Sequence, residues 1–430
     1  MAEWRNWSGS VTARPDLFAR PTTEAELAGL VRKARKVRVV GAGHSFMPLC
    51  ATDGLLLDLS ALEGEIDVAD DRASVWAPAG MSLAKLTEEL WNHGLSLANQ
   101  GDVNPQSLAG AISTSTHGTG EELGSLATFS LGFRIVTAEG EIVECDATRR
   151  PELFEAARVS LGLLGVMSSI QISVVPAFHL KQRLFGARLG EILERFDEWA
   201  ATNRHAEFFI FPYSDRAVVK ILDNVLTPLR PEPLARDVDE NAFRFACELS
   251  RAMPFAIPML QKLMARVGGA ASESIAPAYE VYPSERTIPF EEMEYELPRA
   301  AGLETLQAVI GDIQKRRLPV VFPFEFRVTA GDDIWLSPFN RGPCASISMH
   351  QYGPMDWKTP FAAIEPIFRA AGGRPHWAKR HTLTARDVYE LYPRAADFER
   401  VRATIDPGAK FANPLMSELF AIEAKTQAAA

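Results

Sequence analysis

Apolar and polar positions in the first 100 residues follow two different periods, which predict strands alternating with helices. Residues 21–36 carry apolar side chains at helical spacing after threonines and acidic residues that suit a helix N-terminus. A β-branched run at 37–40 predicts a strand, as do the runs at 55–59 and 75–78. Helical spacing returns at 83–94, where a glycine ends the pattern.

The pattern changes along the rest of the chain. Apolar and polar residues alternate over 132–143 on both sides of a turn at Glu139-Gly140, which predicts a hairpin. The pattern at 161–175 predicts a glycine-rich turn followed by a strand. Beyond about residue 178 the predicted helices are longer. Strands are expected between and after them, and a helix is expected near the end of the chain. The expected strands are 207–212, 217–221, 319–329 and 345–352, and the expected helix is 385–391.

Two segments of the second half break the regular pattern. Residues 226–239 are rich in proline and charge, which is typical of a surface excursion. Residues 253–267 form the most apolar long stretch, but two prolines, a lysine and an arginine interrupt it. We therefore expect a loop plus an amphipathic helix there, and no transmembrane segment.

Composition narrows the class of protein. The chain has 430 residues, of which 47% are hydrophobic, so it can bury a large core, and its length suggests two to three domains. The net charge of −10 and the lack of a dense Lys/Arg run argue against nucleic acid as a partner. The four cysteines show no CxxC or zinc-type spacing, and no secretory signal begins the chain. A cytoplasmic protein, monomeric or a small homo-oligomer, is expected.

A glycine-rich loop directly follows the strand at 37–40. Gly41, Ala42, Gly43, His44 and Ser45 allow a tight turn whose N–H groups can face an anion. A Rossmann fingerprint would need a third glycine at the next position, which is phenylalanine, so a Rossmann NAD site is disfavoured. The alternative is a plain turn without a ligand, in which the histidine is structural.

A second loop, 106–120, contains almost only small and hydroxylated residues. Such a stretch lets the backbone approach a flat or charged group, and its hydroxyls can bind phosphate or ring edges. The alternative is a flexible linker. Leu108 and Ile112 lie at helical spacing, however, which argues against a pure linker.

Glu325 and Arg327 lie two apart on a predicted apolar strand, so their side chains share one face. Burying both is costly unless they pair or bind a ligand, and a structural salt bridge is the alternative. His350 lies in a similar apolar setting. Lys379 stands among aromatic residues and histidines, where an ordinary surface lysine is the alternative. Neither GxSxG nor HExxH occurs, so neither a hydrolase elbow nor metal catalysis is indicated.

Seven motifs in order along the chain resemble the vanillyl-alcohol-oxidase-type flavoproteins, within them the aldonolactone oxidases and alditol oxidases. The motifs are VRVVGAGHSF, QSLAGAISTSTHGTG, SLGLLGVMSSI, MEYELPR, FEFRVTAGDDIWLSP, GGRPHWAKRH and DPGAKFANPL. The resemblance implies an α+β fold: a two-subdomain FAD-binding domain over 1–178 and an α+β cap domain with a large antiparallel sheet over 179–375. Residues 376–430 would return to the FAD domain and complete the active site.

The resemblance also implies FAD bonded covalently to His44. No cysteine occurs in the second loop, so a second covalent attachment is not expected. The residues that it places around the cofactor are Gly41, Ala42, Gly43, His44, Ser45, Ser107, Gly110, Ala111, Ser113, Thr114, His117, Gly118, Gly165, Val166 and Lys379. The residues that it places at the reacting carbon are Glu325, Arg327, Lys379 and, by a looser match, His350. No metal ligand is implied.

The reaction implied is oxidation of a sugar-derived 1,4-lactone by hydride transfer to flavin N5, with electrons passed to O₂ or another acceptor. An alditol oxidase acting on xylitol or sorbitol is the alternative within the family. Ala111 and the His376-Trp377-Ala378-Lys379 run depart from the alditol oxidases and favour a lactone. A sugar-binding or lactone-hydrolysing protein without a working flavin is the alternative from another class.

Overall fold

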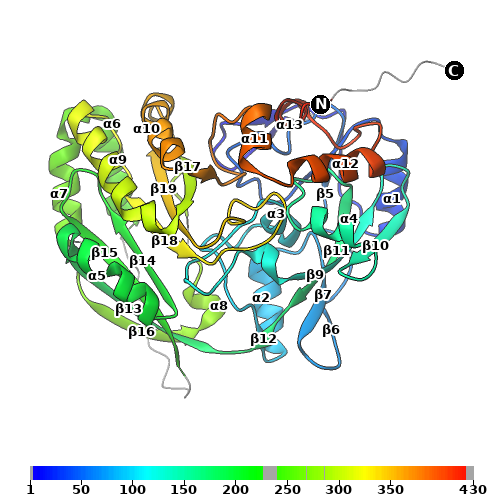
Figure 1. Ribbon diagram of the computed structural model, residues 1–430, viewed down its shortest axis with the longest axis horizontal. Coiled ribbons are helices and arrows are strands. Elements are labelled where there is room, and N and C mark those ends of the chain that lie inside the picture. Colours follow the sequence, from blue (N-terminus) through cyan, green and yellow to red (C-terminus); the bar gives the residue numbers. More distant parts are fainter. Residues whose placement is uncertain (1–2, 226–239, 268, 285, 423–430) are drawn as a thin grey trace.

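The computed structural model describes residues 3–225, 240–267, 269–284 and 286–422. The chain forms two bodies side by side, with the first and last described segments in one body and the middle of the chain in the other (Figure 1). We call them the flavin body, after the expected cofactor, and the cap. No helix among the described residues has the length and apolar character needed to cross a bilayer.

The flavin body begins with a three-stranded parallel sheet of order β3-β5-β4, formed by Leu17–Ala19, Leu55–Asp58 and Val37–Val40. Helix α1 (Glu24–Lys33) packs Leu27 and Val31 against it, and the Thr23 side chain caps the helix by accepting from the Glu26 amide. This arrangement confirms the helix and the two strands expected at the start of the chain.

A five-stranded sheet of order β10-β9-β11-β7-β6 is the larger sheet of the flavin body. Its strands are Ile142–Asp146, Ser130–Val136, Val166–Ser173, Ser74–Pro78 and Asp67–Val68. Three helices accompany it: α2 (Leu83–Asn92), α3 (Leu108–Ser113) and α4 (Pro151–Ala157). The hairpin expected around 132–143 is the antiparallel pair β9–β10.

The C-terminal segment completes the core of the flavin body. Its helices are α11 (Ala385–Leu391), α12 (Ala395–Ile405) and α13 (Pro414–Phe420). Buried residues of this segment, such as Trp377 and Phe398, belong to the same apolar cluster as Leu83 and Phe133 of the flavin body. The described residues after 376 therefore pack with the flavin body, and the bounds 376–430 stay a prediction.

The cap is built on an eight-stranded sheet of order β16-β13-β15-β14-β18-β19-β17-β20, in which every neighbouring pair is antiparallel. In that order the strands are Ser272–Pro277, His179–Arg188, Arg216–Val225, His205–Ile210, Phe324–Thr329, Cys344–Tyr352, Phe290–Pro298 and Arg374–Pro375. All eight lie between 179 and 375, and the cap boundaries at these two residues stay a prediction. The large antiparallel sheet itself is confirmed.

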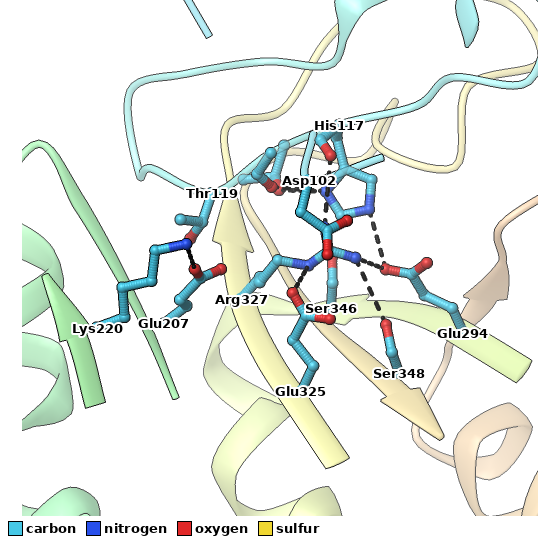
Figure 2. A network of polar contacts seen from close by, with 12 residues as sticks. Asp102, His117, Thr119, Glu207, Lys220, Glu294, Glu325, Arg327, Ser346 and Ser348 are labelled. Atoms are coloured by element: carbon cyan, nitrogen blue, oxygen red, sulfur yellow. Dashed lines mark hydrogen bonds and ion pairs between the residues drawn. The ribbon is translucent and has the colours of Figure 1, made fainter. Parts of the chain in front are cut away.

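The two faces of the cap sheet differ because side chains alternate along each strand. One face is apolar and packs against α5 (Leu189–Thr202), α9 (Gly302–Arg316) and α10 (Lys358–Ala370). The other face carries buried carboxylates, hydroxyls and an arginine on β17, β18 and β19. This polar face lies toward the flavin body, as the contact of Glu294 with His117 shows (Figure 2).

Shorter elements connect these layers. They are the pair β1–β2 (Trp4–Arg5, Thr12–Ala13), the pair β8–β12 (Leu95–Ser96, Val175–Pro176), α6 (Glu240–Ala252), α7 (Ile257–Val267) and α8 (Ala278–Val281). The expected strand at 319–329 begins only at Phe324, since Pro319 and Pro323 cannot donate to a strand ladder. The surface excursion expected at 226–239 lies outside the described residues.

Candidate active site

A cavity of about 450 Å³ lies in the flavin body, within the size range of cofactor sites. Four segments form much of its wall: the loop 41–45, the stretch 105–114, the turn 160–167 and the segment 376–379; residues within 38–40, 49–50, 58–64 and 78–85 also line it. Segments far apart in the sequence therefore meet around one space. Three of the four are glycine-rich or hydroxyl-rich stretches that the sequence singled out.

Small side chains keep the backbone close to this cavity. A Cβ atom on Gly41 would lie 3.1 Å from the Ser107 Cβ and closer still to its hydroxyl. Gly43 and Gly165 have φ values of +71° and +136°, which side chains other than glycine rarely adopt. Larger residues at these positions would strain the loop or fill the space that a ligand needs.

Most of the residues predicted to contact the cofactor line this cavity. They are Gly41, Ala42, Gly43, His44, Ser45, Ser107, Gly110, Ser113, Thr114, Gly165 and Lys379. Four others do not. Ala111 and Val166 point into the apolar core, Gly118 packs against Asn99 and Gln100, and His117 lines a second, smaller cavity.

His44 lies at the wall of the large cavity, where its ring stacks on Trp7 with centroids 5.0 Å apart. The Trp7 amide also donates to the Gly43 carbonyl over 2.9 Å, which fixes the loop. Burial, and then the nearby Lys379 charge, lower the pKa of His44 to about 4. The imidazole is therefore neutral at pH 7 and retains a nucleophilic nitrogen lone pair.

The lining of the large cavity fits FAD. Backbone N–H groups and the hydroxyls of Ser107, Ser113 and Thr114 suit the pyrophosphate and sugar, while Met81 and Met167 suit a flat ring. The N-terminal cap of α3 reinforces the wall, because the Ser107 hydroxyl accepts from the Gly110 amide over 3.3 Å.

The smaller cavity, about 40 Å³, adjoins the large one, with Gln106, His376 and Lys379 lining both. All four residues predicted at the reacting carbon line it. The complete lining is Gly101, Asp102, Val103, Gln106, Thr116, His117, Arg286, Phe290, Glu292, Glu294, Glu325, Arg327, His350, His376 and Lys379. Figure 2 shows the part of this group around Arg327.

Strand register explains this convergence. Glu325 pairs with Ser348 across β18–β19, and Ser348 pairs with Glu294 across β19–β17. His350 stands directly opposite Glu292. Residues paired directly across an antiparallel ladder share a face, so the register resolves the position of His350 that the sequence left ambiguous.

Arg327 is the centre of a buried charge network. Its Nη2 donates to Glu294, and its Nε lies 3.3 Å from Glu325 Oε1. His117 Nε2 lies 3.1 Å from Glu294 Oε1 (Figure 2). Burial and Arg327 act to lower the pKa of His117, but Glu296 and Glu294 outweigh them and raise it to about 9.

Glu325 is the carboxylate of this network with a pKa near neutrality. Burial raises the pKa of Glu325 to about 7, in spite of the opposing charge of Arg327. Glu294 responds in the opposite way. Although burial raises its pKa, the charges of Arg327 and His117 hold that pKa well below its usual value.

Lys379 and Glu292 form a second buried pair on the same face. The Lys379 ammonium donates to Glu292 and lies 5.3 Å from the centroid of the Phe46 ring. Burial opposes the charge of Lys379, but Glu292 and then Glu294 raise its pKa, so it is cationic. His350 Nε2 lies 3.4 Å from Glu292 Oε1. The cation therefore stands where both cavities meet.

Several lining residues escaped the sequence interpretation, in particular Asp102, Arg286, Glu292, Glu294 and His376. The alternation of glutamate with Met293, Tyr295 and Leu297 in residues 291–297 is the signal that could have identified the β17 carboxylates. Asp102 and Arg286 form an ion pair between the flavin body and the cap, and no local pattern marks either one.

One cluster in this network has ligand atoms close enough for a metal ion. The atoms of His117, Glu294 and Glu296 lie within 4.8 Å of one another. The Arg327 guanidinium already contacts Glu294, and the raised pKa of His117 makes its imidazole a cation. Positive charge from the chain itself occupies the cluster, so we assign no metal to it.

Comparison with known proteins supports an FAD site and a resemblance to the lactone oxidases. The family model described as D-arabinono-1,4-lactone oxidase matches residues 170–419, and that described as FAD binding domain matches residues 15–146. The L-gulono-1,4-lactone dehydrogenase of Mycobacterium tuberculosis is 38% identical, over 95% of this chain and 97% of its own length. The alditol oxidase of a Streptomyces species is 31% identical, over 96% and 98%.

Solved structures agree in fold. A solvent-stable cholesterol oxidase superposes with a TM-score of 0.83, covering 97% of each chain at 18% identity. Together with the family matches, this confirms the two-part architecture of FAD domain and cap and the flavoprotein resemblance of the sequence motifs. The chain carries an FAD-binding domain and belongs to the D-arabinono-1,4-lactone oxidase family of FAD-dependent oxidoreductases.

Proposed function

We propose that the protein oxidises a CH–OH group of a sugar-derived 1,4-lactone of the L-gulono, L-galactono or D-arabinono class. One observation carries the proposal: Glu325, Arg327, His350 and Lys379 line a small polar cavity that shares lining residues with the large cavity. A polyhydroxylated ring suits such a lining, because each hydroxyl can bond a charged group that is otherwise costly to bury.

The chain's own residues bind and orient the substrate. Glu325 accepts a hydrogen bond from the hydroxyl to be oxidised, and its pKa of about 7 suits it to take the hydroxyl proton. Arg327 and Lys379 stabilise the negative charge that develops on the oxygen of the substrate hydroxyl, and their positive charge also favours a reduced flavin ring beside them. FAD, held by the residues that line the large cavity, would supply the hydride acceptor of the reaction and the route of the electrons to O₂ or another acceptor.

We further propose that FAD is bonded covalently to His44. The neutral imidazole supports this, since its lowered pKa leaves a nitrogen free to form a bond at pH 7. Stacking on Trp7 holds the ring at the cavity wall. We propose that the other predicted cofactor residues that line the large cavity contact FAD directly. Ala111, His117, Gly118 and Val166 do not line it, and we propose that they act by packing behind the residues that do.

A substrate panel tests the proposed reaction. L-Gulono-, L-galactono- and D-arabinono-1,4-lactone should be oxidised, and xylitol and sorbitol should be poor substrates. Turnover of the polyols alone would favour the alditol oxidase reading, which the Streptomyces relative supports. Running the panel with and without O₂, with a dye as the alternative acceptor, separates an oxidase from a dehydrogenase.

Acid precipitation tests the covalent bond. Wild-type protein should stay yellow in the acid pellet, while His44→Ala should lose its flavin to the supernatant. A yellow His44→Ala pellet would refute the attachment site. Colourless wild-type protein would instead favour a binding or hydrolytic protein without flavin.

We retain a cytoplasmic location and a monomer or small homo-oligomer as predictions.

A further inference from the structure

The helical hairpin of α6 and α7, joined by the short turn Pro254–Ala256, exposes an apolar ridge. Five of the ten large hydrophobic side chains that are exposed among the described residues fall within this hairpin. They are Phe245, Met253, Phe255, Met259 and Leu263, with exposed fractions of 70%, 37%, 84%, 69% and 57%. A concentration of this kind marks an interaction surface rather than scattered surface residues.

The C-terminal half of the ridge is firmly anchored. Met259 and Leu263 lie four residues apart on α7, so they share one side of that helix, and Phe255 lies in the turn just before it. On the opposite side, Ile257 and Gln261 are buried. The Gln261 amide donates to the Val320 carbonyl over 2.7 Å, and its oxygen accepts from the Tyr213 amide over 3.0 Å. The exposure is therefore a property of the packed fold.

The charge around the ridge is opposite to that of the protein. Residues 240–266 contain four basic residues (Arg244, Arg251, Lys262, Arg266) and two acidic ones (Glu240, Glu248), a formal charge of +2, while the whole chain carries −10. Lys262 and Arg266 are exposed beside Leu263. Apolar side chains flanked by basic ones on an anchored amphipathic helix match the chemistry of an anionic lipid surface.

A second copy of the chain fits this surface less well. In a two-fold dimer the same patch meets itself, so the basic side chains of both copies would face one another across the contact. That repulsion is absent when the partner is a sheet of anionic headgroups. We propose that the hairpin docks the enzyme peripherally on an anionic membrane, with the ridge inserted at the level of the headgroups.

The docked surface lies close to the substrate cavity. Phe243 of α6 contacts Phe322 with ring centroids 4.8 Å apart, and Phe322 lies 6.3 Å from His350. Phe290 contacts both Phe322 and His350. Two ring contacts thus separate the hairpin from a residue of the cavity wall. The inference does not depend on which substrate the cavity binds.

Vesicle sedimentation of the flavin-loaded enzyme tests the proposal. Wild-type protein should pellet with phosphatidylcholine–phosphatidylglycerol vesicles, less so at high salt, and stay in solution with phosphatidylcholine alone. The triple variant Phe255→Ser, Met259→Ser, Leu263→Ser should lose about tenfold or more of its vesicle binding. Leu17→Ser with Phe18→Ser removes exposed apolar side chains elsewhere and should bind as wild type.

Charge variants complete the test. The double variant Lys262→Glu, Arg266→Glu should weaken vesicle binding strongly. The control variant Lys33→Glu, Arg35→Glu makes the same change of charge at the end of α1, away from the ridge, and should have little effect on binding. Flavin content and turnover verify that each variant is folded. Wild-type enzyme that stays in solution with anionic vesicles, or a triple variant that binds like wild type, would overturn the proposal. A concentration-dependent dimer abolished by the triple variant, without vesicle binding, would assign the ridge to a second copy instead.

Discussion

The Nε2 atom of His117 lies 3.1 Å from the Oε1 atom of Glu294, and this contact joins the loop after α3 to strand β17 of the cap. Arg327 contacts the same carboxylate. The cations His117 and Arg327 therefore share one buried counter-charge, Glu294. The three residues lie on a loop and two strands that are far apart in the sequence.

Glu294→Gln is expected to destabilise the protein. The substitution leaves Arg327 and His117 buried without their shared counter-charge, which costs about 3 kcal/mol in the free energy of unfolding. Urea unfolding of the flavin-loaded protein measures the change. Glu304→Gln, at an exposed position of α9, is the control and should change stability little. Equal stability of both variants would show that the carboxylate does not hold the network together.

The stability contributed by His117 should depend on pH. Its pKa rises from the ordinary 6.5 to about 9 in the folded protein, because Glu296 and Glu294 outweigh burial and Arg327. The stabilisation is complete below about pH 6.5 and is lost as the pH rises toward 9. The stability difference between wild type and His117→Asn should therefore shrink by about 3 kcal/mol over this range. His93→Asn, at an exposed position outside the network, is the control substitution.

Glu325 should control the pH dependence of the reaction. Since burial raises its pKa to about 7, kcat/KM should increase through that pH as the carboxylate ionises and can accept the hydroxyl proton. Glu325→Gln should lower kcat/KM by about 10²-fold and remove this limb of the profile. An unchanged limb in the variant would place the titrating group elsewhere.

Lys379→Met should reduce kcat more than it raises KM. The ammonium stands where the two cavities meet, so its loss removes positive charge from the reacting centre and costs about 10²-fold in kcat. Lys379→Arg should recover part of the rate. Lys358 also lies over an aromatic ring, that of Trp357, but on the surface, so Lys358→Met is a matched control. A pure KM effect would assign Lys379 to substrate binding alone.

Gly41→Ala should weaken FAD binding. The added Cβ would press against Ser107, whose hydroxyl caps α3 at the cavity wall. Flavin content of the purified variant and its thermal shift on added FAD measure the effect. Gly29→Ala is the control, since nothing lies within 4 Å of the added Cβ and alanine favours the helix α1 there. Full flavin occupancy in Gly41→Ala would contradict the tight contact.

The sequence by itself determined the local elements and much of the flavin body. Period and capping predicted α1, β4 and α11 closely, and the glycines of the loop 41–45 predicted a ligand-binding turn, because these signals depend on neighbours in the chain. The spacing of Glu325 and Arg327 correctly gave them one face of a strand. The motifs in their order gave the family.

Only the tertiary structure decided which side chains meet. Alternation places Glu294 on a face of β17, but the pairing of β17 with β19 and of β19 with β18 brings that face beside Arg327. The Asp102–Arg286 pair forms only where the flavin body meets the cap. Such contacts depend on strand register and on packing between segments distant in the chain, and a local pattern contains neither.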